Sequence, residues 1–438
     1  MSISRRRFLR NSLSATVGGL VAPSFLRDEM LFAARSVSAN DKINVALIGC
    51  RNMGWSNLSD FLINPEVECV ALCDIDRNVL EEKASEVAKR RDNKPTLYSD
   101  YRKMLERKDI DAVIIGTPDH WHCKQMVDAC SAGKDVYVEK PIANSIAECD
   151  IMVAAAHKYN RVVQVGQQQR SGSHWHEMKQ YIDSGKLGKI AQVDVWANFN
   201  YTVIQNPAAD GPVPAGVDYD SWLGPAPSRA FNQNRFHGLW RTFWDYGGGL
   251  MTDWGVHLLD MALWGMDVYT MPNRVLASGG QFSYTNNSAE SFDTLSVIYE
   301  FNDFTIQWNN NAGTKTGPYG RNYGVAFKGT NGTLVANREG WEVIPENNEI
   351  EALNMAPDTS DHRKHVAQFL NCLKTRSMET ACTIENGSLC AKYAHLGNIS
   401  ARVKSELVYD DNKKTFNNKA ADQLIKPTYR SPWKFPIV

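Results

Sequence analysis

From Ile43 onward the chain alternates between short apolar runs and longer amphipathic stretches. The apolar runs have the length of strands, and the stretches between them repeat apolar residues at helical spacing. Such alternation is typical of a parallel sheet covered by helices on both faces. The expected strands are Ile43–Ile48, Val67–Cys73, Ala112–Ile115, Asp135–Glu139 and Val162–Val165, and the expected helices are Ser56–Leu62, Val79–Arg91, Tyr101–Glu106, Lys124–Ala132 and Ile146–Tyr159. We therefore predict a doubly wound α/β nucleotide-binding domain at 41–165.

Beyond Pro272 the pattern changes to short strand-like runs separated by turn residues such as Asn331-Gly332, which suit tight hairpins. The clearest runs are Thr294–Phe301, Thr305–Asn309 and Gly324–Lys328, and helical stretches follow at Arg363–Thr375 and Ser388–Lys404. This order predicts an α+β domain at 166–438, with an antiparallel sheet that carries helices on one face.

The N-terminus carries a near-complete twin-arginine export motif, Ser4-Arg5-Arg6-Arg7-Phe8-Leu9-Arg10. The apolar run after it, Leu13–Leu26, is interrupted by two glycines and a proline, and signals of this kind are addresses read by a receptor, not anchors. A basic disordered tail is the alternative interpretation. We expect residues 1–39 to be a signal peptide and linker, the mature protein to be exported to the periplasm, and no stable membrane span elsewhere.

Composition narrows the class of partner. Lysine and arginine number 48 against 49 acidic residues, a net charge of −1, and no basic run follows the signal, which argues against a nucleic-acid partner. The nine cysteines are an odd number, lie in apolar segments and form no C-x-x-C pair. Buried free thiols are therefore expected, with neither a disulfide framework nor a thiolate zinc site.

The first strand ends in a partial dinucleotide-binding fingerprint, Gly49-Cys50-Arg51-Asn52-Met53-Gly54. Its first and third glycines match G-x-G-x-x-G, whereas Arg51 takes the place of the middle glycine and could contact phosphate instead. Asp74 lies twenty residues beyond Gly54, where an acid binds a ribose 2′-hydroxyl and repels a 2′-phosphate. The spacing favours NAD, and nearby Arg77 leaves NADP as the less favoured alternative.

A later apolar strand, Val136–Val138, runs directly into Glu139, Lys140 and Pro141. A strand of a doubly wound sheet delivers the next residues to the crevice at its carboxyl edge, and Glu and Lys are rarely buried without a partner. Pro141 also biases Lys140 toward an extended conformation. We expect this pair to face a cavity or ligand; the alternative is a strand that ends at the surface with two solvated charges.

The order of these motifs resembles the Gfo/Idh/MocA family of sugar and polyol oxidoreductases. The resemblance rests on the glycine turn, the acid after the second strand, Thr117-Pro118-Asp119-His120-Trp121-His122, Glu139-Lys140-Pro141, Val165-Gly166-Gln167-Gln168-Gln169-Arg170 and Ser184-Gly185-Lys186-Leu187-Gly188-Lys189-Ile190. It covers essentially all of the mature chain. It implies a Rossmann domain followed by a domain with an open, largely antiparallel sheet, and a homo-oligomer, dimer or tetramer, formed through that sheet.

The resemblance also implies site residues. Lys140 would lie beside the nicotinamide and contact the reacting hydroxyl. The expected cofactor-binding residues are Gly49, Arg51, Asn52, Met53, Gly54, Asp74, Thr117, Pro118, His122, Glu139 and Lys140.

The second half supplies candidate substrate contacts. The segment 196–264 contains six of the chain's twelve tryptophans, which suits a carbohydrate cleft, although an aromatic core or subunit interface is the alternative. Asp253, His257 and Asp260 follow a glycine run at spacings that place them on one face of a helix. An isolated D-x-x-x-H would be an ordinary surface pair. In the family, however, an aspartate and a histidine four residues apart flank the substrate, and the histidine is the general base.

The candidate catalytic residues are therefore Lys140, Asp253 and His257, and the candidate substrate-binding residues are Arg170, Trp240, Tyr246, Asp253 and His257.

Two H-x-H pairs, His120/His122 and His174/His176, have the spacing of metal ligands on a strand. The first pair falls inside a predicted dinucleotide-binding loop, where no metal is needed. We expect no metal site.

Together these features predict an NAD-dependent oxidoreductase that transfers hydride to or from a secondary hydroxyl carbon of a sugar, glycoside or polyol. Two alternatives stay open. One is an NAD-dependent glycosidase that oxidises C3 transiently so that the leaving group can be eliminated. The other is a catalytically silent sugar- or nucleotide-binding subunit.

Overall fold

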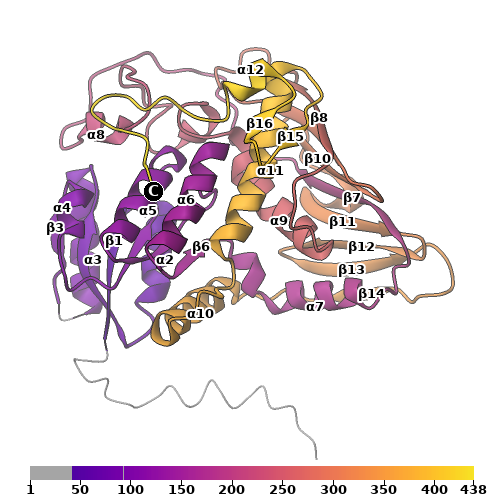
Figure 1. The fold of residues 1–438 in the computed structure, drawn as a ribbon, viewed down its shortest axis with the longest axis horizontal. Coiled ribbons are helices and arrows are strands. Elements are labelled where there is room, and N and C mark those ends of the chain that lie inside the picture. Colours follow the sequence, from indigo (N-terminus) through magenta and orange to yellow (C-terminus); the bar gives the residue numbers. More distant parts are fainter. Residues whose placement is uncertain (1–41, 92) are drawn as a thin grey trace, which may run out of the picture. The chain divides into compact units, whose positions relative to one another are not determined.

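The computed structural model describes residues 42–91 and 93–438 (Figure 1). The predicted export signal at 1–39 lies outside the described residues. Residues Ile43–Val438 pack as one unit that contains two large sheets.

The first sheet is parallel and has six strands in the order β3-β2-β1-β4-β5-β6. Its strands are β1 (Ile43–Ile48), β2 (Val67–Cys73), β3 (Thr96–Tyr98), β4 (Ala112–Ile115), β5 (Asp135–Val138) and β6 (Val163–Val165). This is the strand order of dinucleotide-binding folds, whose ligands lie at the carboxyl edge. The predicted doubly wound parallel sheet is confirmed, and β3, too short to produce a periodic signal, was not predicted.

Helices cover both faces of this sheet. They are α2 (Asn52–Phe61), α3 (Arg77–Arg90), α4 (Tyr101–Leu105), α5 (Asp119–Ser131) and α6 (Ile146–Lys158), joined by α10 (Asp361–Thr375) from far along the chain. The core on one face contains residues of α2, α3 and α10, and the core on the other contains residues of α4, α5 and α6. Phe369 of α10 packs edge-on against Phe61 and Tyr137, at centroid distances of 6.0 and 5.9 Å. The first core is thus completed by the last third of the chain.

The second sheet has eight strands in the order β14-β13-β12-β11-β7-β10-β9-β8. The strands are β7 (Ile190–Ala197), β8 (Arg274–Gly280), β9 (Thr294–Glu300), β10 (Thr305–Asn311), β11 (Tyr323–Gly329), β12 (Gly332–Asn337), β13 (Gly340–Pro345) and β14 (Leu353–Met355). Its neighbours pair antiparallel except for β7 and β10. Along β9, buried Leu295, Val297 and Tyr299 alternate with more exposed residues, as expected for a sheet with one covered face. The predicted largely antiparallel sheet is confirmed.

Helices pack on that one face. The core there combines strand residues with residues of α7 (Ser173–Asp183), the π-helical turn η5 (Met251–Gly255), α9 (Val256–Gly265) and α11 (Ile384–Val403). Residues of α11 also contact α6, so this helix lies between the two sheet layers (Figure 1). The remaining elements are short: η3 (Gln168–Ser171), α8 (Tyr219–Leu223), η4 (Leu239–Thr242), η6 (Pro318–Gly320), β15 (Tyr409–Asp410), β16 (Thr415–Phe416) and α12 (Lys419–Asp422).

A long segment between β7 and η5 has little regular structure and folds back over the carboxyl edge of β2. The Arg77 amide donates to the Gly216 carbonyl (2.9 Å), and the Asp218 amide donates to the Ile75 carbonyl (2.9 Å). Buried aromatic rings hold the segment together, among them Tyr219, Trp222, Phe236, Trp240 and Tyr246. This segment forms a wall opposite the edge where the first sheet presents its loops.

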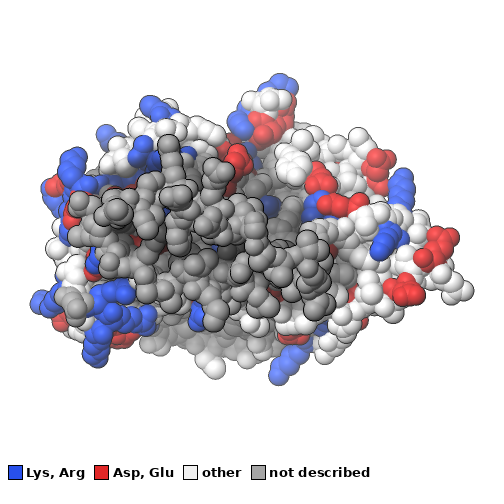
Figure 2. All heavy atoms as spheres, turned by 90° about the horizontal axis from the view of Figure 1, so that it is seen from below, with Lys and Arg blue, Asp and Glu red and all other residues white. Residues whose placement is uncertain are grey.

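Side chains of both charges are spread over the described atoms of the face seen in Figure 2, in keeping with the chain's net charge of −1. Within residues 42–91 and 93–438 no helix combines the length and apolarity that crossing a membrane requires.

Candidate active site

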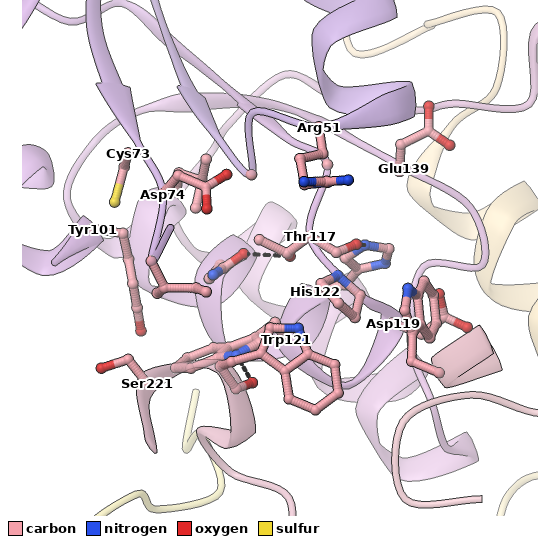
Figure 3. A pocket seen from close by; sticks show the side chains of 18 of the residues that line it. Arg51, Cys73, Asp74, Tyr101, Thr117, Asp119, Trp121, His122, Glu139 and Ser221 are labelled. Carbon is pink, nitrogen blue, oxygen red and sulfur yellow. Dashed lines mark hydrogen bonds between the residues drawn. The ribbon is translucent and has the colours of Figure 1, made fainter. Parts of the chain in front are cut away.

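A cavity of about 340 Å³ lies at the carboxyl edge of the six-stranded sheet (Figure 3). Loops that follow β1, β2, β3, β4 and β5 form one side of it, and residues from the 218–241 segment form another. Eleven of the predicted site residues line the cavity: Gly49, Arg51, Asn52, Met53, Asp74, Thr117, Pro118, His122, Glu139, Lys140 and Trp240. The structure therefore brings together residues that are far apart in the sequence.

Three glycines allow β1, α2 and β4 to approach each other closely at the cavity floor. A Cβ on Gly54 would lie 2.0 Å from the Gly49 oxygen, and a Cβ on Gly116 would lie 2.4 Å from the Gly54 Cα. Gly49 also has a φ of +84°, which side chains disfavour. Gly54 does not line the cavity; its role is this close packing of helix and strand.

The N-terminus of α2 faces this cavity through Arg51 and Asn52. Arg51 is the N-cap residue, but its side chain makes no capping hydrogen bond, and no acidic residue occupies the first turn. The orphan amides and the helix dipole at such an end favour an anion. Arg51 adds a positive charge on the same wall. This end of the cavity thus has the donors that a pyrophosphate requires.

Asp74 sits where β2 ends, beside that phosphate-binding turn. Its Oδ2 accepts from the Cys50 amide (2.7 Å) and its Oδ1 from the Asp76 amide (3.0 Å), which fixes the carboxylate on the cavity wall. Burial raises the pKa of Asp74, although the two amides and Arg51 oppose the shift. Arg77 instead pairs with Glu81 (2.7 Å) and does not line the cavity.

At the other end of the cavity, Lys140 is held by Asp253. The Lys140 Nζ donates to Asp253 Oδ1 (2.7 Å) and to the Asp253 carbonyl (3.0 Å). Arg241 Nε lies 3.3 Å from the same Oδ1, and the Tyr201 hydroxyl donates to Oδ2. Burial by itself would raise the pKa of Asp253, but Lys140, Arg241 and Tyr201 hold it well below its usual range. Asp253 is therefore an anion that orients the amine.

His257 lies behind this pair as a neutral imidazole. It is 6% exposed, and in the described part of the chain nothing hydrogen bonds to its Nδ1. Burial lowers its pKa well below 6.5, and the positive charges of Lys140 and Arg338 lower it further. A buried nitrogen without a partner is costly, so it marks a position where a ligand group can bind. Asp253 and His257 do not line the cavity itself but extend from Lys140 into the second sheet's domain.

Two predicted substrate residues are engaged elsewhere. Arg170 makes a bidentate ion pair with Asp260, with Nε–Oδ2 and Nη2–Oδ1 distances of 2.8 Å each, and neither residue lines the cavity. Tyr246 is fully buried in the aromatic cluster, 4.9 Å from Trp222 between ring centroids. Both residues support the walls of the site in this structure and do not face the cavity.

The expected helical face of Asp253, His257 and Asp260 is not continuous. The segment is a π-helical turn from Met251 to Gly255 followed by α9, which changes the angular spacing of the side chains. Asp253 consequently turns toward Lys140, whereas Asp260 turns toward Arg170.

The two histidine pairs lie on helices α5 and α7, not on strands. His120 Nε2 contacts the Trp222 carbonyl (3.0 Å), and His122 contacts the carbonyls of Pro141 (2.7 Å) and Thr117 (2.8 Å). Burial lowers the pKa of both rings to about 4. Over the described ranges no three His, Cys, Asp or Glu side chains are grouped as a metal site would need.

The sequence analysis did not single out three residues that surround Lys140 and Asp253: Asp119, Arg241 and Tyr201. Asp119 is buried on the cavity wall, where burial raises its pKa against the opposing charges of Arg241 and Lys140. Asp119 lies within the Thr117–His122 motif and Arg241 follows Trp240, so both were near recognised signals. Tyr201 lies in the aromatic-rich segment 196–264, but its hydrogen bond to Asp253 depends on the path of an irregular loop, which the sequence pattern does not specify.

Curated relatives of known activity match only part of this chain. An α-N-acetylgalactosaminidase from Shewanella oneidensis is 30% identical over 172 residues, and a glycosyl hydrolase family 109 protein from Shewanella baltica is 31% identical over 172 residues. Each match covers 36% of this chain and only 38% of the relative.

Solved structures share the fold over most of the chain. The WlbA dehydrogenase of Bordetella pertussis, solved with NADH and UDP-GlcNAcA, has a TM-score of 0.62 at 20% identity. A levoglucosan dehydrogenase, solved with NADH and levoglucosan, has a TM-score of 0.63 at 19% identity. Each likeness covers 84% of this chain and 99% of the other.

Family models match both halves of the chain. Residues 43–167 match the NAD-binding Rossmann fold of the Gfo/Idh/MocA oxidoreductase family, and residues 171–435 match that family's C-terminal alpha/beta domain. Since the second match alone spans more than half of the sequence, the chain belongs to the Gfo/Idh/MocA oxidoreductase family, with NAD as its cofactor.

Proposed function

We propose that this protein is an NAD-dependent oxidoreductase that transfers hydride to or from a secondary hydroxyl carbon of a sugar, glycoside or polyol. One observation carries the proposal: Lys140, oriented by anionic Asp253, lines the cavity at the carboxyl edge of the first sheet, and it is near enough to neutral His257 to lower the pKa of that ring, whose Nδ1 has no hydrogen-bond partner among the described residues. A silent binding subunit would not need this charged arrangement.

The residues present fit NAD. Gly49, Gly54 and Gly116 let β1, α2 and β4 pack closely, which brings the N-terminus of α2 to the cavity. The amides of the first α2 turn can donate to phosphate there, and Asp74 offers a fixed acceptor to a ribose hydroxyl. When bound, NAD supplies the acceptor or donor of hydride. The end of the cavity away from Asp74 is where the loops after β4 and β5 leave the sheet, and it is lined by Asp119, Glu139 and Lys140.

The chain's own side chains handle the proton. Oxidation of a secondary alcohol requires loss of a proton from oxygen together with loss of hydride from carbon. Lys140 can donate a hydrogen bond to the reacting oxygen because Asp253 fixes its Nζ, and the His257 imidazole can accept the proton because it is neutral. Asp253 and Arg241 form an ion pair that keeps this arrangement rigid. Trp240, a ring on the cavity wall, can pack against the apolar face of a sugar.

A second candidate activity is the redox-assisted glycosidase. The match to an α-N-acetylgalactosaminidase favours it, and NAD-dependent glycosidases are a recognised exception to hydrolysis by two carboxylates. The same residues would serve, because oxidation at C3 acidifies the neighbouring C2 proton and permits elimination.

One experiment separates these activities. The purified protein is denatured and the released nucleotide is identified, and the native protein is then offered sugars, polyols and nitrophenyl glycosides. Net formation of NADH supports the oxidoreductase. Release of nitrophenol without net NADH supports the glycosidase, and absence of both activities over a broad panel supports a binding subunit.

Cofactor choice should depend on Asp74. Replacing Asp74 with Ala is expected to raise the affinity for NADP about tenfold relative to NAD, equivalent to about 1.4 kcal/mol, because the repelling charge near the 2′-phosphate is lost. Dissociation constants for both nucleotides measure the change. Asp109→Ala is the control, since it also removes a carboxylate but Asp109 pairs with Arg107 and does not line the cavity. Tighter binding of NADP than NAD by the wild type would contradict this role for Asp74.

If His257 is the general base, the fall of kcat/KM at low pH should follow the protonation of its imidazole. Arg338 Nε donates a hydrogen bond to Gln169 (3.1 Å), and its guanidinium lies 4.8 Å from the Trp254 ring, which in turn lies 5.9 Å from the His257 ring. The positive charge of Arg338 lowers the pKa of His257. Arg338→Gln is expected to raise that pKa toward 6.5, so kcat/KM should fall at a pH higher by on the order of one unit. Arg321→Gln is the control, because Arg321 pairs with Glu342 and does not affect His257. An acid limb that stays in place in Arg338→Gln would exclude His257 as the base.

Two further proposals rest mainly on the sequence. The Ser4–Arg10 motif supports export by the twin-arginine route to the periplasm, which fractionation of expressing cells can test. The face of the eight-stranded sheet away from α9 and α11 supports a homo-oligomer, because the apolar side chains of Ile298 and Ile344 are exposed there. Light scattering of the purified protein measures its mass.

A further inference from the structure

The C-terminal tail, residues 426–438, contributes to the same cavity. After α12 the chain crosses toward α8 and ends beside α5, as the yellow trace in Figure 1 shows. Trp433, a half-buried ring of this tail, lines the cavity together with Asp74 and Gly49. A residue near the end of the chain thus forms part of the wall of the nucleotide site.

Arg430 fastens the tail to the segment around α8. Its Nη1 pairs with Asp220 Oδ1 (2.6 Å), its Nη2 donates to the Asp220 carbonyl (3.0 Å), and its Nε donates to the Gly224 carbonyl (3.2 Å). The Arg430 amide donates to the Pro225 carbonyl (2.9 Å), and the Trp433 amide donates back to the Arg430 carbonyl (2.9 Å). These bonds place the Trp433 ring relative to the wall opposite the first sheet.

Tyr429 fastens the tail to the first domain. Its hydroxyl donates to Glu148 Oε1 (2.6 Å) at the start of α6, and Ser145 and Asn144 donate to the other Glu148 oxygen. Glu148 is 2% exposed, and burial raises its pKa to about 7. The tail is therefore anchored both to the segment around α8 and to the start of α6.

Trp433 stands at the adenosine end of the site. Its ring meets Trp121 edge-on at 4.8 Å, and the Arg102 guanidinium lies 4.9 Å from its centroid. Tyr101 packs against the same Trp121 at 5.7 Å. Tyr101 and Arg102 follow β3, the neighbour of β2 and Asp74, and Figure 3 shows Tyr101 and Ser221 on the Asp74 side, away from Asp119 and Glu139.

We propose that the tail is a fixed strap over the adenosine half of bound NAD, that Trp433 contacts the nucleotide there, and that the strap slows its dissociation. This inference rests on the proposed function, since it assumes NAD in this cavity. Aromatic side chains bind nucleobases through their faces, and a nucleotide beneath the strap must disrupt contacts of Trp433 to leave. The oxidoreductase would therefore retain its cofactor between turnovers.

The test measures dissociation and needs no substrate. Protein loaded with NADH is chased with excess NAD, and the decay of bound NADH fluorescence gives the dissociation rate. Trp433→Ala should release NADH on the order of ten times faster than the wild type, and Trp433→Phe should stay close to it. Arg430→Gln, which loosens the strap, should also accelerate release.

Ile437→Ala is the matched control. Ile437 belongs to the same tail but is 92% exposed and does not line the cavity, so its loss should leave the rate unchanged. Wild-type rates in both Trp433→Ala and Arg430→Gln would overturn the inference, as would equal acceleration by Ile437→Ala. If Trp433→Ala does not fold, the rate of Arg430→Gln decides. A wild-type protein that binds no dinucleotide would instead refute the proposed function.

Discussion

Replacement of Lys140 by Ala is expected to lower kcat by a factor on the order of a hundred to ten thousand while NAD still binds. The amine lies where the loop after β5 meets the cavity, and its two hydrogen bonds to Asp253 fix its position. In the proposed mechanism it donates to the reacting oxygen. Loss of the amine removes a group that acts on the proton, whereas the phosphate-binding turn and Asp74 remain. Measured kcat values and NAD dissociation constants separate the two effects.

Related variants sharpen this expectation. His257→Ala should lower kcat to a similar extent. Asp253→Asn should have a milder effect, because the role of Asp253 is to orient Lys140, and the asparagine could still be held by Arg241 and Tyr201. Lys179→Ala provides a control lysine, since Lys179 pairs with Asp267 (3.0 Å) and does not line the cavity. Near-normal turnover by Lys140→Ala would refute the mechanism, whatever the fold.

The protein should also lose stability steeply as the pH falls from 6.5 toward 4. Burial lowers the pKa of His120, His122 and His395 to about 4 and that of His365 to about 3. The folded state therefore keeps these rings neutral, whereas the unfolded chain protonates them near 6.5. The stability they contribute is complete above pH 6.5 and is lost as the pH falls toward the folded pKa values. One pKa unit corresponds to about 1.4 kcal/mol, so each ring contributes a few kcal/mol.

Urea unfolding at a series of pH values measures this loss. In His365→Gln the dependence of the unfolding free energy on pH should become shallower by about 1.4 kcal/mol per pH unit between pH 6 and 4, because one proton no longer distinguishes the two states. His157→Gln is the control, since the His157 side chain is 64% exposed. Buried carboxyls act in the opposite direction, because a raised pKa favours the folded state at low pH; burial raises the pKa of Glu148, Asp74, Asp119, Glu139 and Asp260. The His365→Gln comparison isolates the histidine contribution from theirs. An unfolding free energy that is constant from pH 7 to 5 would contradict the expectation.

The first sheet was predictable because its strands are buried on both faces. Strands of this kind appear in the sequence as unbroken apolar runs. The bounds of β1, β2 and β4 are accordingly those expected from the sequence. The start of α5 was placed too late, at Lys124 instead of Asp119, because the polar residues of the Thr117–His122 motif hide the helical pattern. The partial fingerprint and Asp74 were recognisable for the same local reason: a strand, a turn and a helix bring them together within one continuous segment.

Local sequence thus predicted the strands and the nucleotide-binding turn, and the resemblance to the family identified Lys140, Asp253 and His257 as candidates. Contacts between distant segments depended on the folded chain. Tyr201 reaches Asp253 from an irregular loop, Asp260 takes Arg170 away from the cavity, and Trp433 reaches the nucleotide wall from the end of the chain. Periodicity and spacing describe neighbours along one element, whereas these contacts depend on how separate elements pack, and packing is determined by the shape of the whole core.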